Sequence, residues 1–166
     1  MASANVKKRA IIWFRRDLRI SDHPALLAAI AASDEIVPLF IMDSRIASKS
    51  GSFRLAYLAQ SLQALDKSLN EKLLVIAGEP SEVLKDVMSR YNAISVHVSA
   101  DYTPYGVARD AKVIENGIEL TQTGSPYAVA PGRVRKSDDT PYRLYPVLSW
   151  LVHSWLACTS CKTIEY

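Results

Sequence analysis

Short apolar runs alternate with longer amphipathic segments along most of this chain. Five of the runs have the branched, apolar composition of strands that are buried on both faces: residues 10–14, 35–42, 73–77, 94–98 and 117–122. The segments between them are predicted to be helices, most clearly residues 52–69. This segment is amphipathic, and its apolar face, with Phe53 and the leucines at helical spacing, is expected in the core. Parallel strands need crossovers of about helix length, so the alternation predicts an α/β domain. We expect a Rossmann-like five-stranded parallel sheet with helices on both faces.

A dense cluster of charge follows the first apolar run. Arg15, Arg16, Asp17 and Arg19 begin where the strand must end, and Asp22 is then expected to cap a helix that has Pro24 in its first turn. Ligands of open parallel sheets bind at the carboxyl ends of the strands. This loop is therefore the natural entrance to a binding site.

Two further loops are expected at the same edge of the sheet. Residues 43–51 form a polar loop after the second strand, and residues 100–110 form a loop after the fourth strand that leads into a helix. His97 lies within the fourth strand and is interpreted as a packed histidine, because no acidic partner is visible nearby. Neither the dinucleotide-binding glycine pattern nor the phosphate-binding loop with its lysine occurs in the chain.

Composition and charge narrow the functional classes only slightly. Of the 166 residues, 49% are hydrophobic and 22% charged, and the net charge of +3 gives no case for DNA binding by this chain. The single Cys-x-x-Cys pair, Cys158 and Cys161, lacks the further ligands of a zinc site and the context of a redox motif. No secretory signal or membrane span is expected, so a cytoplasmic location is predicted.

Several strings resemble one protein family. Residues 13–26, WFRRDLRISDHPAL, closely resemble the opening motif of the DNA photolyase and cryptochrome family, and residues 101–110, DYTPYGVARD, are a second highly specific match. Weaker similarity is carried by Phe53-Arg54 and by residues 124–132 and 139–145. The resemblance implies light-driven DNA repair by a lyase, or blue-light sensing, through a flavin held in a large helical domain.

The resemblance also implies a domain organisation. Residues 1–9 are interpreted as a basic tail, residues 10–130 as the photolyase-type α/β domain, and residues 131–166 as a truncated connector with a divergent tail. After Tyr145 the expected threonine and phenylalanine are missing, and residues 148–166 are expected to have no family resemblance. A short deletion, frame shift or premature stop in a photolyase gene would produce this pattern. The FAD-binding domain is then absent from this chain, so no catalytic residue is assigned.

In the family, this domain holds an antenna pigment, which is a folate, a deazaflavin or FMN. The resemblance and the loop chemistry together give these candidate pigment-binding residues: Phe14, Arg15, Arg16, Asp43, Lys49, Arg54, Asp101 and Tyr102. Phe14 offers a ring for stacking, the arginines can bind phosphate or carboxylate oxygens, and Asp43 and Asp101 can accept hydrogen bonds. The competing interpretation is that these charged residues only form salt bridges between the loops or face the missing domain: Arg15, Arg16, Arg19, Asp17 and Asp43.

Two differences favour a deazaflavin or FMN over a folate. Folate-binding members of the family typically have an Asn-Glu pair where this chain has Tyr105-Gly106, and a histidine near the position of Lys49. Two other functional classes stay open at this point. One is a small nucleotide-binding or electron-transfer protein that shares only the fold. The other is a subunit whose apolar residues 147–157 dock on a separately encoded flavin domain.

Overall fold

The computed structural model describes residues 7–140, and it contains one five-stranded parallel sheet. The strands are β1 (Arg9–Phe14), β2 (Glu35–Met42), β3 (Leu74–Ala77), β4 (Ala93–Val98) and β5 (Leu120–Gln122), and their order in the sheet is β3-β2-β1-β4-β5. β1 is the central strand, and the order reverses direction beside it, because the chain passes from β3 across to β4. This reversal opens a crevice at the carboxyl ends of the strands, where ligands of such sheets bind. The predicted fold class is confirmed.

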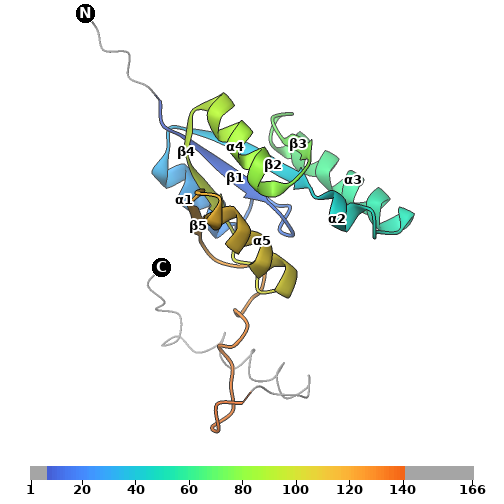
Figure 1. Cartoon of the computed structure of the whole chain (residues 1–166), viewed down its shortest axis with the longest axis vertical. Coiled ribbons are helices and arrows are strands. Elements are labelled where there is room, and N and C mark those ends of the chain that lie inside the picture. Colours follow the sequence, from blue (N-terminus) through green and yellow to red (C-terminus); the bar gives the residue numbers. More distant parts are fainter. Residues whose placement is uncertain (1–6, 141–166) are drawn as a thin grey trace, which may run out of the picture. The chain divides into compact units, whose positions relative to one another are not determined.

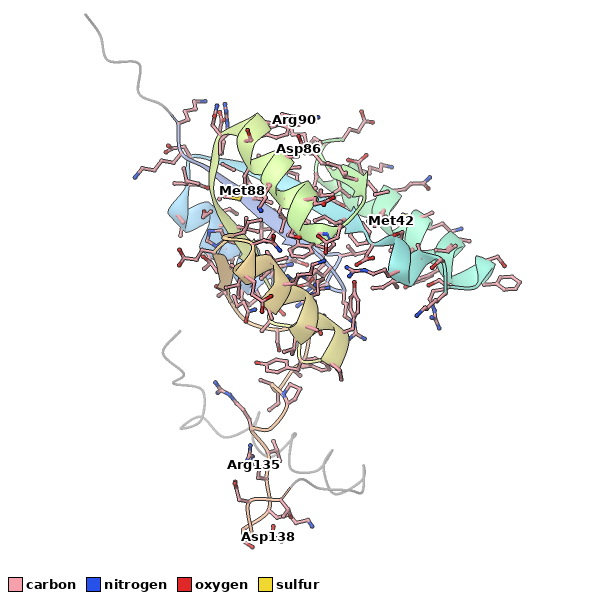
Figure 2. The ribbon with its side chains drawn as sticks, viewed as in Figure 1. Met42, Asp86, Met88, Arg90, Arg135 and Asp138 are labelled. Carbon is pink, nitrogen blue, oxygen red and sulfur yellow. The ribbon has the colours of Figure 1, made fainter. Side chains whose placement is uncertain are left out.

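Helices α4 (Pro80–Tyr91) and α5 (Pro104–Glu115) cover one face of the sheet (Figure 1). Alternate residues of the central strands, such as Ile11 and Leu39, meet Leu84 and Val87 of α4 there. The opposite face of α4 is polar and carries the exposed ion pair between Asp86 and Arg90 (Figure 2). Val83, Leu84 and Val87 of α4 therefore form the buried face of an amphipathic helix.

Helices α1 (Pro24–Ala32) and α3 (Ser52–Ser68) cover the other face. Ile12, Phe14 and Phe40 point to this side and pack against Leu62 and Leu65 of α3. Strand residues alternate between the two faces, so both clusters come from the same apolar runs. This explains why β1 is almost continuously hydrophobic.

Three of the crossover helices begin with proline, which suits the first helical position because that amide has no helical partner. Pro24, Pro80 and Pro104 each follow a capping side chain. The prediction that Asp22 caps α1 is wrong, because His23 caps it by accepting a hydrogen bond from the amide of Leu26 at Nδ1. Asp22 instead adopts a left-handed backbone conformation, with a φ of 50°.

Three sequence-based expectations differ from the structure. The predicted loop 43–51 contains a single helical turn, α2 (Ser44–Ala47), and the fifth strand is shorter than residues 117–122. Phe53 was expected in the core with the leucines of its helix, but its side chain is 92% exposed. It lies in the first turn of α3, whose buried leucines, Leu62 and Leu65, lie farther along the helix.

The chain divides into two compact units, residues 1–126 and 127–166. The sheet and all of the helices and strands described above belong to the first unit. The connector after residue 140 and the Cys158–Cys161 pair lie outside the described residues. Among residues 7–140, no helix is long and apolar enough to cross a membrane.

Candidate pigment-binding site

A cavity of about 140 Å³ lies at the carboxyl ends of β1 and β2. Its walls are mainly apolar and include Trp13, Phe14, Phe40, Leu55 and Leu58. Met42, at the end of β2, also lines it and lies close to α2 (Figure 2). The cavity is therefore built from the first two predicted loops together with α3, α4 and α5. Concave, mostly apolar pockets with a few polar groups are the usual form of small-molecule sites.

A broader, open groove of about 700 Å³ adjoins this cavity. Ile46, Ser50 and Tyr105 line both spaces, so the two are neighbours. The remaining residues of the groove are polar or cationic: Arg45, Ser48, Lys49 and Arg54. The site thus has an apolar inner part and a cationic outer part.

Asp43 and Tyr105 form the boundary between these two parts. The Tyr105 hydroxyl donates a hydrogen bond to the Asp43 carboxylate, and Arg45 binds the same carboxylate through Nε at 2.9 Å and Nη2 at 2.5 Å. The hydrogen bonds from Arg45 are the main cause that lowers the pKa of Asp43 to about 2. Burial and the bond to Asp43 raise the pKa of Tyr105 to about 12. Asp43 is thus ionised and Tyr105 neutral at physiological pH.

A buried ion network fixes the loops behind the cavity. Arg15 forms a two-pronged pair with Asp110 of α5, with Nη1 at 2.9 Å and Nη2 at 2.8 Å from the carboxylate oxygens. Arg109 contacts both Asp110, at 3.0 Å, and Asp101, at 3.4 Å. Burial, and then the nearby charge of Arg109, lower the pKa of Arg15 to about 10, so the guanidinium stays cationic.

The same arginines flank the buried indole of Trp13. The guanidinium carbons of Arg15 and Arg109 lie 4.0 Å and 5.0 Å from the ring centroid. The Arg15 side chain is 5% exposed, yet its Nε has no hydrogen-bond partner among the described residues. An unpaired buried donor of this kind is uncommon in folded proteins.

A second buried cluster holds the first loop against β4. Asp17 accepts a hydrogen bond from the Ser99 hydroxyl and lies 3.1 Å from Nε2 of His23. Burial alone would raise the pKa of Asp17, but the hydrogen bonds from His23 and Ser99 outweigh it and lower the pKa to about 2. Because His23 also caps α1, this cluster ties the loop, the helix and the sheet together.

Asp101 fixes the start of α5 and restricts the residue at position 106. Its carboxylate accepts hydrogen bonds from the amide and the hydroxyl of Thr103, and Thr103 caps the helix. A Cβ atom on Gly106 would lie 2.2 Å from the Asp101 carboxylate carbon, closer than real atoms approach. The carboxylate of Asp101 therefore occupies the space that a side chain at position 106 would need.

The structure brings most of the predicted site residues to this edge of the sheet, in different roles. Phe14, Arg15, Arg16 and Asp43 line the cavity, whereas Lys49 and Arg54 line the groove. Arg15 and Asp43 are held in the ion pairs described above. Two of the predicted residues, Asp101 and Tyr102, line neither space, and Tyr102 is 44% exposed.

Sequence reasoning missed several residues of the site. Tyr105 and Arg109 are one helical turn apart on α5, inside the string 101–110, and this spacing could have indicated a shared face. The cavity residues Ala47, Leu55 and Leu58 were not identified, because apolar residues of a predicted helix are interpreted as core residues by default. His97 is buried as expected, and burial lowers its pKa.

Comparison with known proteins decides the family. The family model described as DNA photolyase matches residues 10–157. This chain belongs to the DNA photolyase family. The match extends beyond Tyr145, so the expectation that residues 148–157 have no family resemblance is wrong. The family assignment made from the motifs is confirmed.

Individual relatives include both branches of the family. A deoxyribodipyrimidine photo-lyase of Agrobacterium fabrum is 32% identical over 142 residues, which are 81% of this chain and 29% of that protein. Cryptochrome-2 of Gallus gallus is 36% identical over 121 residues, or 68% of this chain and 21% of that protein. The chain thus spans less than a third of the length of these relatives.

Solved structures agree with the fold. A bacterial class III photolyase from Agrobacterium tumefaciens has a TM-score of 0.79 at 28% identity, covering 92% of this chain and 33% of that one. An archaeal photolyase from Sulfolobus tokodaii has a TM-score of 0.65 at 30% identity, covering 77% of this chain and 32% of that one. Members of the family bind flavin and antenna chromophores.

Proposed function

We propose that this chain is the antenna-pigment-binding part of a photolyase family protein, and that its pigment is a flavin or a deazaflavin. The observation that carries the proposal is the aromatic cavity at the switch point of the sheet, with a cationic groove beside it. A flavin-type pigment has a planar ring system and a polar tail, so it matches an apolar chamber with a polar extension.

The residues of the site fit such a pigment. Trp13 and Phe40 give the cavity aromatic surface, which a ring system can contact at small entropic cost, whereas Phe14 lies behind it, fully buried. A bound pigment would supply light absorption and energy transfer, while the protein excludes water, fixes the ring plane and holds the tail.

Gly106 argues against a folate. In folate-binding relatives a glutamate is expected at this position, and here the Asp101 carboxylate already fills the space that its side chain would need. The Sulfolobus tokodaii relative is described as holding two FAD molecules, with the implication of a novel light-harvesting cofactor. That description supports a flavin as the second pigment of a related protein.

The proposal assigns no lyase activity to residues 7–140 by themselves. Truncation of the gene, docking on a separately encoded flavin domain, absence of direct DNA binding and a cytoplasmic location stay predictions. Repair chemistry depends on the catalytic flavin, and electron transfer from that cofactor defines the reaction. Light-dependent repair therefore belongs to an assembly that contains the flavin domain.

The test is equilibrium dialysis of the purified chain against FMN and a deazaflavin, followed by absorption spectra of the retained pigment. We expect one pigment per chain. Ala47→Phe places a ring in the cavity that Ala47 lines and should abolish retention. Ala56→Phe, on the exposed side of α3, is the matched control and should retain the pigment.

Two outcomes would refute the proposal. One is a folded chain that retains neither pigment at any concentration below the millimolar range. The other is equal retention by wild type and Ala47→Phe, which would place binding outside the cavity. Circular dichroism of both variants separates loss of binding from loss of the fold.

A further inference from the structure

We infer that the site selects a pigment with a phosphorylated tail, and that this tail lies in the groove between α2 and α3. The inference rests on the proposed function, because it decides which pigment the cavity takes. It favours FMN or another flavin phosphate over a deazaflavin or riboflavin with an uncharged tail. Lys49 and Arg54 are the residues assigned to the phosphate.

The cations that line the groove differ in whether their charge is already paired. Arg45 is bound by Asp43 and also lies 3.5 Å from Glu79, so its charge is already compensated. The side chains of Lys49 and Arg54, in contrast, have no hydrogen bond or ion pair with any described residue, and both residues line the groove. The groove therefore carries an uncompensated charge of about two, which favours a doubly charged phosphate over a neutral tail.

The acidic side chains near the groove are already paired with groups of the protein. Asp43 would repel a phosphate, but its carboxylate already accepts hydrogen bonds from Arg45 and Tyr105. Glu79, the other nearby acid, is occupied by Ser81 and by Lys112, at 3.1 Å. Both acids are therefore paired within the protein, and neither compensates the charge of Lys49 or Arg54.

The start of α3 adjoins Ser50 and Arg54 of the groove. Gly51 caps this 17-residue helix without a side-chain hydrogen bond, and no acidic residue lies in its first turn. The other four helices of residues 7–140 begin with a capping side chain. Free amides at a helix start attract anions, so this end adds to the effect of the two cations.

The pairing of Arg15 indicates the direction of the ligand. Its guanidinium lies beside Trp13 and is already paired with Asp110, so it offers no free charge to a phosphate at the inner end of the site. Arg16 also lines the inner cavity and is exposed. It is a single cation, whereas the groove offers two, so the groove is the better phosphate site.

The experiment compares FMN with riboflavin, because the two differ only in the phosphate. Equilibrium dialysis of the full chain should give an FMN affinity at least about tenfold above that of riboflavin. The double variant Lys49→Ala/Arg54→Ala should lose this advantage while its riboflavin affinity stays unchanged. Lys67→Ala removes one positive charge at the far end of α3, outside the groove. It is the control for the loss of a single charge and should change neither affinity.

Three further arms make the outcome decisive. Rising salt should weaken FMN binding and leave riboflavin binding unchanged, because salt screens exposed charges. Arg16→Ala should affect both ligands equally, and a selective loss of FMN in this variant would overturn the assignment to the groove. FAD is the third ligand, because its tail carries a pyrophosphate whereas FMN ends in a single phosphate. FAD binding that depends on Lys49 and Arg54 also supports the inference.

The failure of this inference can be told apart from the failure of the proposed function. Equal binding of FMN and riboflavin, with both blocked by Ala47→Phe, would overturn the phosphate selection and leave the pigment site intact. Binding of neither ligand would overturn both statements. Tighter binding of a deazaflavin with an uncharged tail than of FMN would also overturn the inference.

Discussion

Substitution of Gly106 by alanine tests the packing that excludes a side chain from position 106. In an ordinary helix this change stabilises the protein, because alanine is favoured over glycine by about 1 kcal/mol. Here we expect the opposite. The new Cβ would lie 2.2 Å from Cγ and 2.3 Å from Oδ2 of Asp101, so the carboxylate must move.

The cost follows from the bonds that the Asp101 carboxylate makes. Displacement breaks its hydrogen bonds to the amide and hydroxyl of Thr103, at 3.0 Å and 2.8 Å, and its contact with Arg109 at 3.4 Å. Loss of a helix-start arrangement costs about 1 kcal/mol, and overpacking adds about 1–3 kcal/mol. After the gain from alanine, the free energy of unfolding should fall by about 1–3 kcal/mol.

Urea denaturation followed by circular dichroism measures this change. Gly51→Ala is the control for a Cβ added without a clash, because a Cβ at position 51 would meet no atom within 4 Å. It should cost no more than about 1 kcal/mol, since glycine is preferred to alanine at the start of a helix. In the Asp101→Ala background the carboxylate is gone, so Gly106→Ala should no longer be costly. A neutral or stabilising Gly106→Ala in the native background would refute the reasoning and reopen the folate alternative.

Three further predictions concern charge and packing. The pKa of Asp17 is lowered to about 2, so the native chain should lose about 2 kcal/mol of stability as pH falls from about 4 to about 2, and Asp17→Asn should flatten this acid limb of the unfolding curve. Phe53→Ser should change the denaturation midpoint little, because Phe53 is 92% exposed, whereas Leu62→Ala should cost about 2–5 kcal/mol. A large effect at Phe53 would show that its ring is covered in solution. Tyr105→Phe removes the hydrogen bond to Asp43 and should lower the free energy of unfolding by about 1 kcal/mol, and an unchanged midpoint would contradict a structural role for that bond.

Much of the fold could be predicted because the relevant signals are local. Apolar runs that are buried on both faces identify the central strands, and a proline followed by an amphipathic segment identifies the crossover helices. The cap of α1 was misassigned because aspartate is a common capping residue, while histidine acts here only through its particular ring nitrogen.

The site was harder to predict because its residues are chosen by long-range pairing. Arg15 and Asp110 are far apart in sequence, and only the crossover to β4 brings them together in an ion pair. An arginine free to bind a phosphate and an arginine bound to a buried aspartate look alike in a sequence. The cation pair of the groove could be separated from Arg15 and Arg45 only when the partners of each were known.

The most direct test of the pigment site is the fluorescence of Trp13 during a flavin titration. The chain has three tryptophans, so Trp150→Phe/Trp155→Phe leaves Trp13 as the single emitter, and Trp13 lines the cavity. FMN bound in the cavity should quench this emission almost completely, with saturation at one FMN per chain. Retention of FMN with unchanged Trp13 emission would show that the pigment binds elsewhere and would contradict the account.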